Sequence, residues 1–232
     1  MWSLLKKSES IFLTRRKKTR FPSTIQIRHQ YLILLISEKL EHYRIPLYNS
    51  LVSNIDLTVI HKDSKLANCK FKQKKLDIIK FNGLNYYKLK TLNEYDYVIY
   101  PFNIRVINLA LELMKLKRNY KIGVFGIGVS ASYTKSYDKK TALNLLRKLY
   151  LKKFDFGIFY ENYPFIKYTS AGVNPKKLSV AYNTVLPNPN FDFNQKKYLS
   201  FLFIGSLYKE KKIFELLHAY LYLYLNNSSI YF

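Results

Sequence analysis

The sequence predicts an α/β fold, a Rossmann-like doubly wound parallel sheet, on three observations. Apolar runs of strand length, such as Tyr31–Ile36 and Tyr120–Phe125, recur along the chain between longer segments of helical periodicity. The first run is apolar at every position, which is typical of a parallel strand buried on both faces. Strands that alternate with helices form βαβ units, and βαβ units build a parallel sheet.

The first βαβ unit spans residues 31–60. After the strand Tyr31–Ile36 comes a polar loop, and Pro46 suits the first turn of a helix that continues to about Ser53. Asp56–Ile60 is rich in β-branched residues and is expected to be the second strand. The connection between two such strands is almost always right-handed.

The middle of the chain is less regular at residues 62–93. Leu76–Phe81 and Tyr86–Leu89 flank Asn82-Gly83, a strong turn signal, and the three segments indicate a short hairpin. A strand, a helix and a strand are then expected at Tyr95–Tyr100, Ile104–Lys115 and Tyr120–Phe125.

The next helix, Thr141–Leu151, is expected to turn one face inward and the other to solvent. The expected inward residues are Ala142, Leu145, Leu146 and Leu149, and the expected outward residues are Arg147, Lys148 and Lys152. The remaining expected elements are the strand Phe154–Tyr160, the helix Glu161–Ser170 and the strand Leu178–Tyr182.

This order of expected strands and helices divides the chain into four parts. Residues 1–30 are a basic N-terminal tail, either solvated and poorly ordered or an anchor to anionic lipid. Residues 31–183 form one Rossmann-like domain, and residues 184–198, rich in Asn and Pro, form a linker. Residues 199–232 are the start of a second domain, whose last residues depart from helical periodicity.

The composition limits the classes of protein to which this chain could belong. Lys and Arg number 39 against 15 Asp and Glu, a net charge of +24, which suits nucleic acid, anionic lipid or a phosphorylated substrate. AT-rich coding, which favours Lys, Asn, Ile, Tyr and Phe, explains the same charge. The single Cys69 excludes a disulfide framework, and no cysteine cluster for a metal exists. Without a long apolar run or an export signal, the protein is expected in the cytoplasm, with peripheral contact at the inner face of a membrane as an alternative.

The stretch Leu199–Tyr220, LSFLFIGSLYKEKKIFELLHAY, predicts a strand, a glycine turn and a helix. In open α/β sheets, ligands bind outside the carboxyl ends of the strands. Gly205 lets a ligand approach the backbone, and the start of the helix offers free N–H groups to an anion. This stretch is a candidate phosphate site, although such turns also occur for structural reasons alone.

Two stretches resemble group 1 nucleotide-sugar glycosyltransferases of the GT-B type. FIGSLYKEKKIFELLHAY is similar to the start of their second domain, with Lys212 at a position that is usually glycine. LISEKLEHYRIPLYNSLVSNIDLTVIH is similar to their opening, where a loop ends in Tyr-Arg-x-Pro and a strand closes in Thr-Val-x-His. The resemblance covers about residues 31–220 and implies that Gly205, Ser206 and Lys211 bind the donor diphosphate.

On the acceptor side, the residues that could line the interdomain cleft lie in loops after predicted strands. They are Glu38, Tyr43, Arg44, His61, Gly126, Gly128 and Asn183. A solvated loop explains the first three equally well, and His61 could simply cap its strand. GVFGIGVSAS at 123–132 is not the dinucleotide fingerprint, because it lacks the last glycine and does not follow the first strand. The family often has His-Gly here, so Ile127 leaves no acceptor-side histidine.

The resemblance implies transfer of a sugar from a nucleotide diphosphate sugar to a saccharide or lipid-linked acceptor, with retention at the anomeric carbon. It implies no cofactor and no metal, and a role in surface polysaccharide or glycan synthesis. No glutamate follows Glu215, although the family uses a glutamate pair late in the second domain. The chain is therefore expected to be truncated and inactive alone. The alternatives are a basic nucleic-acid-binding protein and a non-catalytic Rossmann-like binding domain.

Overall fold

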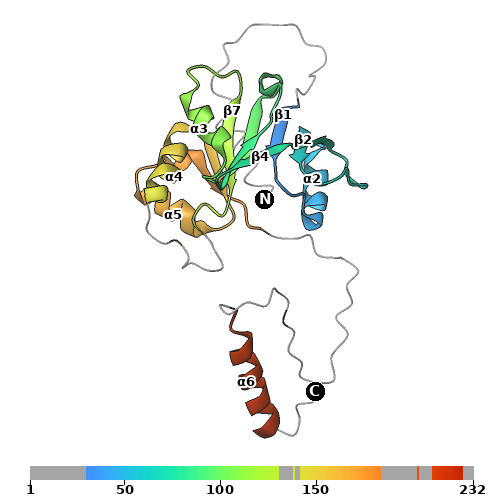
Figure 1. Ribbon diagram of the computed structural model, residues 1–232, viewed down its shortest axis with the longest axis vertical. Helices are drawn as coiled ribbons and strands as arrows, with labels where there is room; N and C mark the ends of the chain where they lie inside the picture. The colour runs from blue at the N-terminus through green and yellow to red at the C-terminus, as the bar shows by residue number, and fades with distance from the viewer. Residues whose placement is uncertain (1–29, 131–137, 139–141, 184–202, 204–210, 227–232) are drawn as a thin grey trace, which may run out of the picture. The chain divides into compact units, whose positions relative to one another are not determined.

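The computed structural model describes residues 30–130, 138, 142–183, 203 and 211–226. The chain divides into two compact units, one of residues 1–129 with 140–186 and one of residues 130–139 with 187–232. In the first unit, seven parallel strands form one sheet in the order β3-β2-β1-β6-β7-β8-β9 (Figure 1). The predicted α/β fold with a doubly wound parallel sheet is confirmed.

The strand order changes direction at β1, as in Rossmann folds. The strands are β1 (Leu32–Ile36), β2 (Asp56–His61), β3 (Lys72–Lys75), β6 (Tyr97–Pro101), β7 (Lys121–Gly126), β8 (Phe156–Phe159) and β9 (Leu178–Val180). β1 pairs with β2 on one side, where Ile36 lies opposite Ile60, and with β6 on the other, where Ile33 lies opposite Tyr97. Ligands of such sheets bind beyond the carboxyl ends of the strands near this reversal.

Helices cover both faces of the sheet. α2 (Ile45–Leu51) lies on one side of it, and α3 (Ile107–Met114), α4 (Ala142–Lys153) and α5 (Asn162–Ser170) lie on the other (Figure 1). Right-handed crossovers that change direction at β1 produce this arrangement. Alternate residues of β1 serve the two cores: Leu34 and Ile36 pack with the α3 side, and Leu35 packs with the α2 side.

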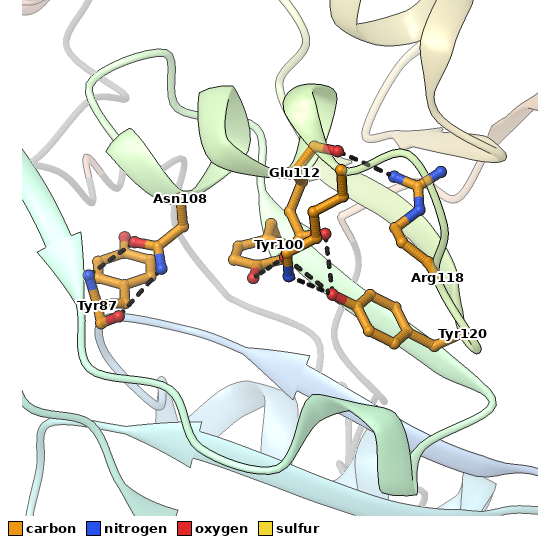
Figure 2. A network of polar contacts seen from close by, with 7 residues as sticks. Tyr87, Tyr100, Asn108, Glu112, Arg118 and Tyr120 are labelled. Carbon is orange, nitrogen blue, oxygen red and sulfur yellow. Dashed lines mark hydrogen bonds and ion pairs between the residues drawn. The ribbon is translucent and has the colours of Figure 1, made fainter.

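The predicted hairpin forms from β4 (Ile78–Phe81) and β5 (Leu84–Tyr87). Asn82 and Gly83 both have positive φ, 46° and 77°, as a type I′ turn requires. Asn108 of α3 accepts a hydrogen bond from the Tyr87 backbone N–H at 2.7 Å and donates one to its carbonyl at 3.0 Å (Figure 2). The side-chain amide of Asn108 thus makes the pair of backbone hydrogen bonds that a neighbouring strand would make, and it holds the hairpin against α3.

A buried carboxylate joins α3 to the sheet. Glu112, 3% exposed, accepts hydrogen bonds from the hydroxyls of Tyr120 at 2.9 Å and Tyr100 at 3.4 Å (Figure 2). Lys115 forms an ion pair with Glu112 at 2.7 Å and supplies the compensating charge. Burial, reinforced by the negative charge of Glu112, raises the pKa of Tyr100. Burial also raises the pKa of Tyr120, so both hydroxyls stay protonated and donate to Glu112.

Three elements differ from the sequence-based predictions. β3 was not predicted, because KQKK has no apolar residue, and its lysines mark it as an edge strand. In α4, Leu146 packs against the core as predicted, but Arg147, Tyr150 and Leu151 are buried and Leu145 is 70% exposed, so the rest of the predicted inward face is wrong. α6 (Ile213–Asn226) in the second unit continues through residues that were expected to leave helical periodicity.

Candidate functional site

A shallow pocket of about 690 Å³ lies at the carboxyl edge of the sheet in the first unit. Its lining comes from the loops after β1, β7, β8 and β9 and consists of Tyr43, Arg44, Ile127, Tyr160, Glu161, Tyr182 and Asn183. The carboxyl ends of parallel strands meet at one edge of a sheet, so these loops, although far apart in the sequence, converge there.

Arg44 is the only basic side chain among the described lining residues. It ends the 3-10 turn His42–Arg44 and is the N-cap residue of α2, and Pro46 in the first turn of that helix restricts the backbone that follows the guanidinium-bearing residue. Its Nη2 donates a hydrogen bond to the Tyr160 hydroxyl at 2.8 Å. Burial opposes the charge, but the hydroxyls of Tyr160 and Tyr48 outweigh that effect and raise the pKa of Arg44.

Three aromatic rings surround the Arg44 guanidinium. Its Cζ atom lies 5.1 Å from the ring centre of Phe125, 5.2 Å from that of Tyr160 and 5.6 Å from that of Tyr43. The rings of Phe125 and Tyr160 pack edge to face with their centres 5.3 Å apart, and this contact holds the ends of β7 and β8 together. Cation–π contacts of this kind orient a cation without neutralising it.

The predicted glycine loop forms one wall of the pocket through Ile127. Gly128 has φ +84°, and a Cβ atom there would lie 2.7 Å from Cβ of Pro164 and 2.8 Å from Cδ1 of Phe159. The carbonyl of Gly128 accepts a hydrogen bond of 2.7 Å from the buried hydroxyl of Tyr168 in α5. Only glycine combines this backbone conformation with such close packing, so the loop is tied to β8 and α5.

The other wall comes from the ends of β8 and β9. Asn183 lies directly after Tyr182, whose hydroxyl accepts a hydrogen bond of 2.9 Å from Asn162 at the start of α5. Glu161 precedes this helix and makes no side-chain cap to it. Asn183, Tyr43 and Arg44, which were predicted from sequence, therefore lie at one pocket together with the loop of Gly126 and Gly128.

Glu38 does not line this pocket. Its Oε1 accepts hydrogen bonds from the Tyr87 hydroxyl at 2.6 Å and from Nδ2 of Asn85 at 3.0 Å. Tyr87 is fully buried, and burial together with Glu38 raises its pKa. Glu38 thus connects the loop after β1 to the hairpin, a structural contact that its sequence position did not reveal.

His61 also lies away from the pocket lining. It is the last residue of β2 and is 1% exposed. Its Nε2 lies 3.2 Å from Oε1 of Gln73 in β3, and its Nδ1 is buried without a hydrogen bond. Gln73 Oε1 can only accept, so Nε2 carries a proton and donates in this contact. These contacts agree with the strand-capping alternative given for this residue.

The donor-side prediction falls in the second unit. Gly205 and Ser206 lie outside the described residues, so the diphosphate site stays a prediction. Lys211 is exposed and stands two residues before α6. Lys212 has φ +52°, a left-handed conformation that glycine adopts without strain, and glycine is usual at this position in the resembled family.

Three aromatic residues of the site were not predicted from the sequence: Phe125, Tyr160 and Tyr182. Each stands at or just beyond the end of a predicted strand, so the rule that placed Gly126 at the ligand edge would also have placed them there. Within the described ranges, no three His, Cys, Asp or Glu side chains are grouped as a metal site requires. None of the helices in the described part of the chain is long and apolar enough to cross a membrane.

The sequence matches no family model and no curated protein. Among solved structures, it is similar to HepE from Anabaena in complex with UDP, with a TM-score of 0.42, and in complex with UDP and glucose, with a TM-score of 0.43. In both cases the identity is 14% over 66% of this chain and 44% of the HepE chain. The chain thus spans less than half the length of HepE, and the similarity concerns the fold alone.

Proposed function

We propose that the first unit is the acceptor-binding part of a glycosyltransferase that uses a nucleotide diphosphate sugar. The acceptor is a saccharide or a lipid-linked saccharide, and the activity belongs to the synthesis of a surface polysaccharide or another glycan. It takes place in the cytoplasm, at the inner membrane face when the acceptor is lipid-linked. By resemblance, transfer retains the configuration of the anomeric carbon and needs neither a metal nor a cofactor.

The convergence of the predicted loops at one pocket carries this proposal. Tyr43 and Arg44 come from the Tyr-Arg-x-Pro loop, Ile127 from the glycine loop and Asn183 from the end of the last strand. These are the loops that the resemblance places at the acceptor cleft. The pocket offers flat tyrosine faces with hydroxyls at their edges and a few polar groups, a composition suited to a small polar ligand.

The rival proposal, binding of nucleic acid, predicts a basic stripe interleaved with aromatic side chains. The pocket has the aromatic side chains but only Arg44 as a cation among its described lining residues, and it also contains Glu161. A phosphate backbone needs several cations in a row to bind tightly. The pocket therefore favours a small ligand.

On the donor side, the backbone of Lys212 supports the resemblance, because it adopts the glycine conformation expected there. We infer that Lys211 and the N-terminal N–H groups of α6 stabilise the negative charge that develops on the leaving diphosphate. Gly205 and Ser206 contribute the close backbone approach in this proposal.

Saccharide binding tests the function directly. Titration of the isotope-labelled full chain with a panel of oligosaccharides is expected to shift the backbone amide resonances of Arg44, Ile127 and Asn183. The shifts should weaken far less with added salt than those caused by a nucleic acid, because Arg44 is the only cation among the described lining residues and a single charge contact releases few counterions. If no saccharide shifts these amides while a single-stranded oligonucleotide does, and the effect disappears with added salt, the glycosyltransferase proposal is wrong.

Turnover by this chain alone is expected to be negligible. The diphosphate contact that the resemblance assigns to Lys211 contributes at most about 3 kcal/mol, which is too little to hold and activate a donor by itself. The assay follows release of nucleotide diphosphate from a panel of nucleotide sugars with an acceptor present. Turnover that is lost in Lys211→Ala would contradict this expectation and would show that the chain completes its donor site in another way.

A further inference from the structure

Arg44 forms no ion pair with any of the described residues. A guanidinium has five N–H donors, and among the described residues Arg44 meets only two hydroxyls: that of Tyr160, hydrogen-bonded at 2.8 Å, and that of Tyr48. Its Nε is buried without a hydrogen bond. The ion pairs among the described residues do not include Arg44, although Glu161 lines the same pocket.

The surroundings of Arg44 hold this charge in place without satisfying it. Phe125, Tyr160 and Tyr43 surround the guanidinium with ring faces, and Pro46 restricts the backbone after it. A cation that is partly buried and lacks a carboxylate partner is costly unless another group compensates the lost hydration. Side chains held in advance in a binding geometry lose little entropy when the ligand arrives.

We propose that the acceptor saccharide carries an oxyanion, a carboxylate or a phosphate, and that this group binds Arg44. The inference rests on the proposed acceptor function and adds the chemical class of the acceptor. Arginine suits this role because its planar fork of N–H groups matches both oxyanions and forms charge-assisted hydrogen bonds. The neighbouring tyrosines then contact the sugar ring, and the hydrogen bond to Tyr160 keeps the guanidinium facing the pocket.

Two matched pairs of ligands test the proposal by calorimetric or NMR titration of the full chain. One pair is an oligosaccharide that contains glucuronic acid and its carboxyl-reduced counterpart, and the other is a hexose phosphate and the free hexose. The charged member of at least one pair should bind about tenfold more tightly or better, the value expected for one charge-assisted contact. The pair that shows the preference identifies carboxylate or phosphate as the source.

The variants assign that preference to Arg44. Arg44→Gln should remove it, and Arg44→Lys should keep part of it, because an ammonium retains the charge but not the fork. Arg105→Gln is the matched control: it removes one positive charge from an exposed position outside the pocket lining and should keep the preference. If Arg44→Gln does not fold, Arg44→Lys and the weakening of the wild-type preference by added salt decide the question.

Three results would overturn the inference. Equal binding of charged and neutral members, with shifts at the pocket amides, would reject the anionic acceptor and leave the acceptor function standing. Binding of inorganic phosphate as tight as that of the hexose phosphate would reject a saccharide as the bearer of the charge. Absence of any saccharide binding would reject the proposed function together with this inference.

Discussion

Replacement of Glu112 with alanine is expected to lower the free energy of unfolding by about 3 kcal/mol, because two buried hydroxyls lose their acceptor and each unsatisfied group costs about 1–3 kcal/mol. The hydroxyls are those of Tyr100, fully buried, and Tyr120, 5% exposed (Figure 2). Lys115 loses its ion-pair partner as well. Urea unfolding followed by circular dichroism measures the change.

Two further variants test whether the loss of stability in Glu112→Ala comes from the buried hydrogen bonds or from the loss of one negative charge. Glu112→Gln keeps an oxygen that accepts from both hydroxyls and should destabilise the protein less than Glu112→Ala. Glu94→Ala removes the same charge at an exposed position and should change the free energy of unfolding by less than about 0.5 kcal/mol. A Glu112→Ala variant as stable as Glu94→Ala would show that the network does not hold α3 to the sheet.

Replacement of Gly128 with alanine is expected to destabilise the protein by about 3 kcal/mol, the sum of about 1–2 for a left-handed backbone and about 1–3 for overpacking. The new Cβ atom would lie 2.7 Å from Cβ of Pro164 and 2.8 Å from Cδ1 of Phe159, at a residue with φ +84°. Because Ile127 precedes Gly128 and lines the pocket, saccharide binding should weaken too. Urea unfolding and the saccharide titration measure the two effects.

Gly172→Ala is the control for backbone strain. Gly172 has φ +83°, almost the same as Gly128, and a Cβ atom there would meet nothing within 4 Å. This variant should lose only about 1 kcal/mol and bind saccharide normally. Equal destabilisation by the two alanines would show that the contacts of Gly128 with α5 and β8 contribute nothing.

Local patterns account for the elements that were predicted correctly. The apolar run of β1, the β-branched residues of β2 and the Asn82-Gly83 turn each specify their structure through neighbouring residues alone. β3 carries no such pattern, because Lys72–Lys75 is an edge strand that needs only its backbone to pair with β2. Its existence depends on the strand beside it.

The faces of α4 show how tertiary packing overrides a helical pattern. The periodicity of its leucines predicted burial of Leu145 and Leu149, yet these are 70% and 43% exposed. The helix instead turns Tyr150 and Leu151 toward the core, where Tyr150 stacks on Phe154 at 5.4 Å. A large aromatic ring buries more apolar area than a leucine, so it decided the orientation.

Only some of the residues predicted for the candidate site line the pocket. The rule that ligands bind at the carboxyl ends of strands placed Tyr43, Arg44 and Asn183 at the edge of the sheet where the pocket lies. The rule could not separate them from Glu38 and His61, which stand at the same edge but are held by Tyr87 and Gln73. Tertiary packing decides which of these polar groups line the pocket and which form hydrogen bonds with other side chains.

By itself, the sequence determined the order of the strands and helices other than β3, the parallel arrangement of the sheet and the edge at which loops gather, because hydrophobic periodicity and turn residues act over short stretches of chain. Only the tertiary structure decided that Arg44 meets Tyr160, 116 residues further along, and Phe125 at the end of β7. That contact depends on the reversal of strand order at β1, which carries the loop after β1 toward the ends of β7 and β8. No local sequence pattern determines how close two distant loops come, so the aromatic residues around Arg44 are identified only from the assembled sheet.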